Sequence, residues 1–281
     1  MLYKNMFGPR QPDPGGMLAL RLGPKKLTVP IAIGGPCSIE SEEQVDRIFG
    51  AIGGHITHMR GGVFRQGTYP GSQGAWVGSP RPKGGVSPGW RMDLLRMCHA
   101  KSLEIGRPNV VEVLDIRDLD AIYPYAGAFQ VGTRQAQHYA LLEELGRQDK
   151  PVFLKRGTWQ KLSELLGSIE YVFKGGNTEV AVIERGSVSF MDHVRWDLSI
   201  SLIAKLKQLT RVPVVVDASH GTGDRSIVKA MTLAGVAAGA DGFLCETHYD
   251  PDGSLSDAEQ AVPLEAFVDI AESVARLRRA L

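Results

Sequence analysis

The stretch VPVVVDASHGTGDRSIVKAMTLAGVAAGADGFLCE, residues 212–246, predicts a strand, a helix and a second strand in that order. Residues 212–217 and 242–246 are short, mostly apolar runs, and apolar residues recur at helical spacing over 227–238 between them. Strands that are apolar on both faces and alternate with helices are typical of a parallel sheet, because helices cover both of its faces. The stretch therefore predicts one β/α unit of an α/β fold.

The same pattern recurs along the rest of the chain. Strands are expected at 31–35, 56–60, 110–115, 128–132, 151–156, 180–185, 212–217 and 242–246. Helical spacing is found at 43–49, 135–145, 198–206, 227–238 and 264–281, with Ser41 and Asp118 placed as helix caps. Eight such units in a chain of this length favour a (β/α)8 TIM barrel over a doubly wound sheet, which usually has fewer strands.

The N-terminal part carries a different signal. Residues 18–22 and 27–29 flank Gly23-Pro24 and predict a β-hairpin that would cap the bottom of the barrel. We therefore expect an N-terminal tail at 1–15 and a single barrel domain at 16–281. The long irregular stretch 61–88 is rich in Gly, Pro and Ser, and a loop of that length in a compact domain is usually functional or disordered.

Composition excludes several classes of protein. The net charge is +1, which gives no electrostatic signature of nucleic-acid or membrane binding. No apolar run is long enough to span a bilayer, and the N-terminus lacks the apolar stretch of a signal peptide. Three cysteines in 281 residues argue against a disulfide framework and for a reducing compartment, so a cytoplasmic protein is expected.

Ionisable residues occur at nearly every predicted strand end, where a barrel forms its active site. They are Cys37, Arg60, Asp115, Arg134, Lys155, Arg156, Glu184, Arg185, Asp217, His220, Glu246 and His248. Cations are in excess, because Arg60, Arg65, Arg134, Lys155, Arg156 and Arg185 all fall in this set or next to it. Salt bridges that seal the rim would explain one such residue, but a cluster of cations suits an anionic substrate that carries phosphate and carboxylate.

A smaller group of these residues consists of potential metal ligands. Cys37, His220, Glu246 and an acid from Asp250, Asp252 or Asp257 would provide a thiolate, an imidazole and two carboxylates. This set suits a borderline divalent cation such as Mn, Fe, Co or Zn. Structural roles without a metal could also explain these residues: Cys37 as a packed thiol, His220 as a hydrogen-bonding residue of a loop, and Asp257 as a helix cap.

These residues lie in phrases that resemble one enzyme family, the 3-deoxy-D-arabino-heptulosonate 7-phosphate (DAHP) synthases, together with the related 3-deoxy-manno-octulosonate 8-phosphate synthases. The resemblance covers residues from about 16 to the C-terminus. The phrases are Gly35-Pro36-Cys37-Ser38-Ile39-Glu40-Ser41, Arg60-Gly61-Gly62, Val131-Gly132-Thr133-Arg134, Pro151-Val152-Phe153-Leu154-Lys155-Arg156-Gly157, Asp217-Ala218-Ser219-His220-Gly221-Thr222-Gly223, Glu246-Thr247-His248 and Leu255-Ser256-Asp257.

The resemblance implies a role for each matching position. Cys37, His220, Glu246 and Asp257 match the metal ligands, and Cys37 matches the metal-dependent members. Residues that match the phosphoenolpyruvate site are Arg60, Arg65, Gly132, Thr133, Arg134, Lys155 and Arg185. Lys155, His220 and Cys37 are the expected catalytic residues, with Lys155 or His248 a candidate for proton transfer. We expect the aldehyde to contact Arg65, Gln66, Thr68 and Asp217.

One departure from the family concerns the aldehyde. DAHP synthases carry Lys-Pro-Arg-Thr after the second strand and the octulosonate-phosphate synthases carry Lys-Ala-Asn-Arg-Ser, whereas this chain has Arg65-Gln66-Gly67-Thr68-Tyr69. Gly67 replaces the arginine that grips the aldose phosphate, and losing such a contact removes about 1.5–3 kcal/mol. Arg81 or Lys83 could compensate, but we favour a non-standard aldehyde.

The sequence thus predicts a metal-dependent condensation of phosphoenolpyruvate with an aldehyde, giving a 3-deoxy-2-keto acid and phosphate. The alternatives are an authentic DAHP synthase of aromatic amino acid biosynthesis or an enzyme making a sugar acid like 3-deoxy-manno-octulosonate 8-phosphate, a metal-dependent 2-keto acid aldolase, and a barrel kept only as a ligand-binding module. The sequence leaves primary or secondary metabolism open. No nucleic-acid or membrane partner is expected. The resemblance implies a homo-oligomer, a dimer or a tetramer.

Overall fold

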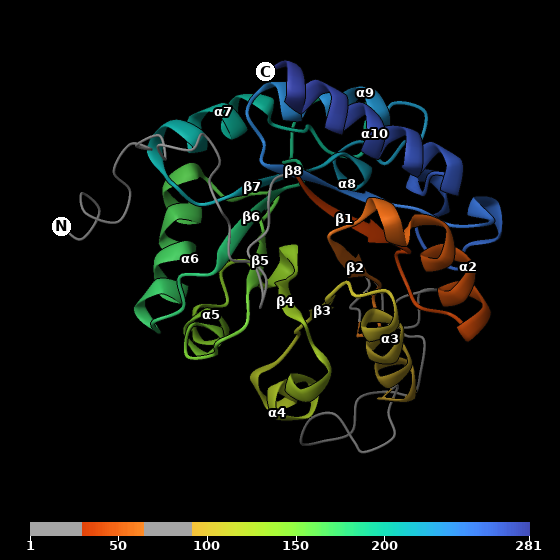
Figure 1. The fold of residues 1–281 in the computed structure, drawn as a ribbon. Helices are drawn as coiled ribbons and strands as arrows, with labels where there is room; N and C mark the ends of the chain where they lie inside the picture. Colours follow the sequence, from red (N-terminus) through yellow and green to blue (C-terminus); the bar gives the residue numbers. More distant parts are fainter. Residues whose placement is uncertain (1–29, 65–91) are drawn as a thin grey trace.

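The computed structural model describes residues 30–64 and 92–281, which form a closed parallel barrel of eight strands in sequence order, β1 to β8. Helices surround the strands (Figure 1). Pairing of β8 with β1, with Leu244 opposite Ile33, closes the cylinder. The (β/α)8 prediction is confirmed. The strands are β1 (Ile31–Gly35), β2 (His58–Arg60), β3 (Asn109–Glu112), β4 (Ala128–Val131), β5 (Val152–Lys155), β6 (Val180–Glu184), β7 (Val214–Asp217) and β8 (Gly242–Glu246).

The helices follow the strands as the periodicity indicated, and three of them, α3, α6 and α8, lie outside the predicted set. The helix α10 packs against α9 and α2, which seals the join between the last and first units. The helices are α2 (Glu42–Ile52), α3 (Met92–Glu104), α4 (Leu119–Ile122), α5 (Tyr139–Gly146), α6 (Leu162–Lys174), α7 (Ile200–Leu209), α8 (Ala218–Thr222), α9 (Val228–Ala237) and α10 (Leu264–Ala280).

Local capping explains where α2 begins. The Ser41 side chain accepts a hydrogen bond from the Gln44 backbone N–H, as expected of an N-cap at the start of α2. After β3 the prediction is wrong in detail. Asp118 stands at the N-cap position of α4 without a side-chain capping bond, and it is Asp115, three residues earlier, that accepts from the Arg117 N–H.

Two apolar layers hold the barrel together. Alternate strand residues point inward and outward, so each strand contributes to both layers. The outer layer lies between strands and helices and includes Ala32, Leu154, Val182 and Val216. The inner cluster fills the barrel and consists of Ile31, Ile33, Val110, Ala128, Phe153, Ala181, Ile183, Val215 and Leu244.

The predicted hairpin and the tail at 1–15 lie outside the described residues, as do Arg65, Gln66, Gly67, Thr68, Arg81 and Lys83. Within the described ranges, no helix has the length and apolar character needed to cross a membrane.

Candidate active site

Strand parity places a polar layer directly above the apolar filling of the barrel. Lys155, Asp217 and Glu246 each stand two residues beyond a member of the inner cluster, and side chains two residues apart in a strand share a face. All three are at most 5% exposed. Their strand ends lie at the C-terminal mouth of the barrel, which is where enzymes of this fold build their active sites.

The four predicted metal ligands converge at this mouth. Donor atoms of Cys37, Glu246 and Asp257 all lie within 4.8 Å of one another. Cys37 Sγ donates to Asp257 Oδ2 over 2.9 Å, and His220 Nε2 lies 3.3 Å from Glu246 Oε1. The thiol follows β1, the imidazole belongs to α8, and the two carboxylates come from the end of β8 and the segment after it.

Charges around Glu246 favour its ionised form. Arg60 Nη1 lies 2.5 Å from Glu246 Oε1, and Gln260 Nε2 donates to Oε2 over 2.5 Å. Burial would raise the pKa of Glu246, but the charges of His220 and Arg60 hold that pKa below its ordinary value. The pKa of Arg60 is raised, because Glu246 and Cys37 outweigh the opposing effect of burial. The carboxylate is therefore ready to act as an anionic ligand.

Lys155, Asp217 and His220 form a second connected group. Asp217 Oδ2 lies 3.1 Å from Lys155 Nζ and 2.8 Å from His220 Nδ1, and Asp217 Oδ1 accepts from the His220 backbone N–H over 3.0 Å. Burial would raise the pKa of Asp217, but His220 and Lys155 hold it well below its usual range. Burial lowers the pKa of His220 despite the neighbouring carboxylates, which favours the neutral imidazole that binds metals.

Arg185 is a buried cation whose side chain points to an anion-binding role. It is 5% exposed, and its Nε and Nη1 have no hydrogen-bond partner among the described residues. Burial lowers the pKa of Arg185 to about 10, although Asp217 opposes this shift. Trp196 covers the guanidinium, with the ring centroid 5.2 Å from Cζ. A buried guanidinium without an ion pair is costly, and an anionic ligand would remove that cost.

Apart from Arg156, the remaining predicted cations are Arg134, which the structure describes, and Arg65, which it does not. Arg134 is exposed in the turn after β4, and its charge helps to lower the pKa of Arg185. Before it come Gly132 and Thr133, and a side chain at Gly132 would collide with Glu112 Oε1. Arg65 lies outside the described residues, as do Gln66 and Thr68 of the expected aldehyde site.

Arg156 was wrongly counted among the free cations of the rim. It makes a two-pronged contact with Glu184, at 2.5 Å from Nε to Oε2 and 2.9 Å from Nη2 to Oε1. Arg156 directly follows β5 and Glu184 ends β6, both at positions of the outward-facing alternation, so their side chains lie outside the barrel interior. Asp115 likewise binds Arg117, and His248, the alternative candidate for proton transfer, contacts Gln44 and the backbone of Asp250. These contacts are structural.

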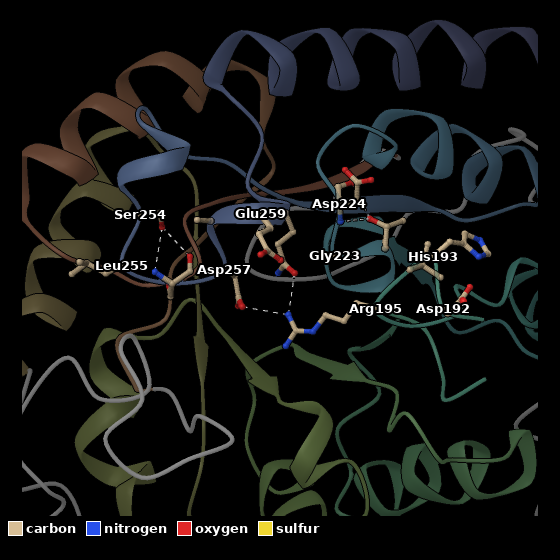
Figure 2. A pocket seen from close by; sticks show the side chains of 14 residues that line it. Asp192, His193, Arg195, Gly223, Asp224, Ser254, Leu255, Asp257 and Glu259 are labelled. Carbon is tan, nitrogen blue, oxygen red and sulfur yellow. Dashed lines mark hydrogen bonds and ion pairs between the residues drawn. The ribbon is translucent and has the colours of Figure 1, made fainter. Parts of the chain in front are cut away.

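Two residues that the sequence did not single out complete the site. Gln260 is 2% exposed and bonds Glu246, while Arg195 Nη1 lies 3.3 Å from Asp257 Oδ1 and 3.2 Å from Gln260 Oε1. Both line a cavity of about 720 Å³ beside the ligand cluster, with Thr222, Asp224 and Asp257 (Figure 2). No motif in the sequence marks them, because the contacts of Arg195 with Asp257 and Gln260 join segments more than 60 residues apart.

The fold and the site together define a barrel enzyme with a set of metal-type donors beside a buried, unpaired cation. A family model described as the DAHP synthetase I family matches residues 26–281. A "Phospho-2-dehydro-3-deoxyheptonate aldolase" of Thermotoga maritima is 34% identical over 253 residues, covering 89% of this chain and 70% of the relative. A "2-dehydro-3-deoxyphosphooctonate aldolase" of Syntrophobacter fumaroxidans is 28% identical over 259 residues, covering 88% and 86%.

Solved structures agree with these relatives. The crystal structure of the Thermotoga maritima DAHP synthase superimposes with a TM-score of 0.84 at 28% identity, covering 99% of this chain and 77% of that one. A truncated form of the synthase from the same organism gives 0.76 at 29% identity, with 90% of each chain covered. The chain belongs to the DAHP synthetase I family. It is therefore an enzyme of the phosphoenolpyruvate-dependent, aldol-type synthase class, and the aldehyde is left open.

Proposed function

We propose that the protein condenses phosphoenolpyruvate with an aldehyde at the mouth of the barrel, giving a 3-deoxy-2-keto acid and phosphate with the help of a divalent metal. The observation that carries this proposal is the meeting of three donor atoms within 4.8 Å at the same mouth as the unpaired Arg185. A set of metal-type donors and a buried cation able to bind an anion are the two features that this reaction requires.

The donor set fits a borderline divalent cation. One thiol, one imidazole and two carboxylates are ligands that Mn, Fe, Co and Zn accept. Cys37, His220, Glu246 and Asp257 would hold the ion. When bound, it would supply Lewis acidity toward the aldehyde oxygen. The Cys37 thiol, which donates a hydrogen bond to Asp257 in this structure, would lose its proton when the metal binds.

The cations of the chain would fix phosphoenolpyruvate. Arg185, Arg134, Arg60 and the Gly132-Thr133 backbone would bind its phosphate and carboxylate, which holds C3 in position to attack the aldehyde carbon. Water then adds at C2, and phosphate leaves by cleavage of the C–O bond. Lys155 would move a proton to or from that water, and its contact with Asp217 at 3.1 Å would hold its Nζ in place.

The aldehyde is proposed to be non-standard, because Gly67 stands where the family has an arginine. The second candidate is an authentic DAHP synthase using erythrose 4-phosphate, which the name of the Thermotoga relative favours. Product analysis after incubation with phosphoenolpyruvate, Mn²⁺ and a panel of phosphorylated and unphosphorylated aldehydes separates the two. Erythrose 4-phosphate as by far the best substrate would reject the non-standard aldehyde.

The metal is tested by Cys37→Ala and His220→Ala, each of which is expected to abolish both metal binding and turnover. Cys98→Ala serves as the matched control, since Cys98 is a buried thiol on α3, away from the ligand cluster. Full activity in metal-free variants would refute this role.

We also propose a cytoplasmic homo-oligomer, dimer or tetramer, with small-molecule substrates only. Sedimentation of the purified chain measures its assembly.

A further inference from the structure

The loop between β6 and α7 pairs with the short helix that carries His220. The Arg195 N–H donates to the Thr222 carbonyl over 2.8 Å, and the Trp196 N–H donates to the Gly221 carbonyl over 3.0 Å. Gly223, at φ 70°, ends α8, and a Cβ there would lie 2.6 Å from Arg195 Cβ. Only glycine allows this approach without strain. The backbone of residue 195 is therefore fixed relative to His220.

The side chain of Arg195 crosses from that loop to the segment after β8. Its Nη1 lies 3.3 Å from Asp257 Oδ1 and 3.2 Å from Gln260 Oε1 (Figure 2). Asp257 is the one non-glycine residue with positive φ in the described ranges, at 49°. Such a conformation persists when surrounding contacts enforce it, and it is common at functional sites. Arg195 provides one of those contacts.

Gln260 joins the same segment to β8. Its backbone N–H donates to the Asp257 carbonyl over 3.2 Å, while its side-chain Nε2 donates to Glu246 Oε2 over 2.5 Å. The amide is suited to this position because it donates to a carboxylate at one end and accepts from a guanidinium at the other. A carboxylate could not donate to Glu246, and an apolar side chain would leave a buried oxygen unsatisfied.

We propose that Arg195 and Gln260, here called the Arg195–Gln260 brace, are positioning residues that keep His220, Glu246 and Asp257 at the spacing a divalent cation needs. The inference rests on the proposed function, in which these three residues are metal ligands. Neither member of the brace is itself a ligand in this account. Partners behind metal ligands typically affect metal affinity 10–100-fold.

The test measures binding of Mn²⁺ alone to Gln260→Leu, Arg195→Ala and the double variant, by competition with a chelating dye. Absorption of Co²⁺ added in its place reports the ligand geometry. Each single variant is expected to bind Mn²⁺ about 10–100-fold more weakly and to change the Co²⁺ spectrum. Because Arg195 contacts Asp257 directly as well as Gln260, the double variant should bind Mn²⁺ at least as weakly as Gln260→Leu alone.

Matched controls lie just after α5, where Arg147 pairs with Glu143 and Glu144 and Gln148 bonds Glu144. Arg147→Ala and Gln148→Leu remove the same kinds of contact away from the site, and wild-type Mn²⁺ affinity is expected in both. Thermal melting without metal checks folding. If Gln260→Leu fails to fold, Arg195→Ala alone decides, since the Arg195 side chain is 45% exposed and its removal leaves no core cavity.

Wild-type Mn²⁺ affinity in Arg195→Ala and in folded Gln260→Leu would overturn the brace, as would a wild-type protein that binds no Mn²⁺. Failure of the proposed reaction gives a different result. In that case the wild-type protein binds Mn²⁺ and the variants bind it more weakly, yet phosphoenolpyruvate and aldehydes release no phosphate.

Discussion

At the scale of single residues, strand parity decides which charges belong to the site. Lys155 and Asp217 continue the faces of Phe153 and Val215 and so point into the barrel, while Arg156 and Glu184 fall on the alternate face and pair with each other. Two neighbouring cations, Lys155 and Arg156, therefore have different tasks. Lys155 faces the candidate site, where we propose that it contacts the substrate, whereas Arg156 holds two strand ends together.

Arg185→Met is expected to stabilise the protein while impairing its function. Removing a buried guanidinium without an ion pair should raise the free energy of unfolding by about 1–3 kcal/mol. The same change should abolish the rise in melting temperature that phosphoenolpyruvate produces in the wild-type protein. Thermal melting with and without phosphoenolpyruvate measures both effects. A less stable variant that still responds to phosphoenolpyruvate would contradict the role given to Arg185.

Arg156→Ala should behave in the opposite way. It leaves Glu184, which is fully buried, without its guanidinium partner, and breaking such a pair typically destabilises a protein by about 3–5 kcal/mol. Arg117→Ala is the control, since Arg117 pairs with Asp115 but is 58% exposed, and little change is expected. Urea unfolding measures the free energy of unfolding of the two variants. An equal loss of stability in both would contradict the claim that burial makes the Arg156–Glu184 pair more important to stability than the exposed pair.

The sequence predicted the residues of the site better than their contacts. Cys37, His220, Glu246 and Asp257 were recognisable because each lies in a phrase that resembles the family. Gln260 and Arg195 were not, because their importance comes from contacts across 62 and 65 positions of the chain. The pairing of Arg156 with Glu184 could have been anticipated from the parity of β5 and β6.

At the scale of elements, the strands were predictable because they are apolar on both faces, which leaves little ambiguity about their burial. The ends of the strands were harder to predict than the strands themselves. For example, β7 begins at Val214, two residues later than expected. The helix α6 was missed although Leu165, Ile169 and Val172 mark its buried face at helical spacing. The close packing of α5 on α6 could not be read from periodicity, because it depends on glycines.

Gly146→Ala tests that packing. A Cβ at Gly146 would lie 2.3 Å from the Val172 carbonyl oxygen, so we expect the two helices to be forced apart at a cost of about 1–3 kcal/mol. Gly167→Ala, within α6, is the control: a Cβ there meets nothing within 4 Å, and alanine should stabilise the protein by about 0.4–1 kcal/mol. Chemical unfolding of both variants should give changes of opposite sign, and a shared sign would contradict the packing argument.

At the scale of the whole molecule, closure of the barrel brings together proposed metal ligands that are far apart in the sequence. Cys37 and Asp257 are 220 residues apart, and their contact exists because β8 pairs with β1. The repeating β/α units made this architecture predictable. The predicted hairpin and the loop with Gly67 lie outside the described residues, and both stay predictions.

The most direct test follows the bridging oxygen of phosphoenolpyruvate. The wild-type protein is incubated with Mn²⁺, an accepted aldehyde and phosphoenolpyruvate labelled with ¹⁸O between C2 and phosphorus, and the released phosphate is analysed by mass spectrometry. The account predicts labelled phosphate that forms only when both aldehyde and metal are present. Phosphate released without aldehyde, or without the label, would contradict a condensation that ends in C–O cleavage.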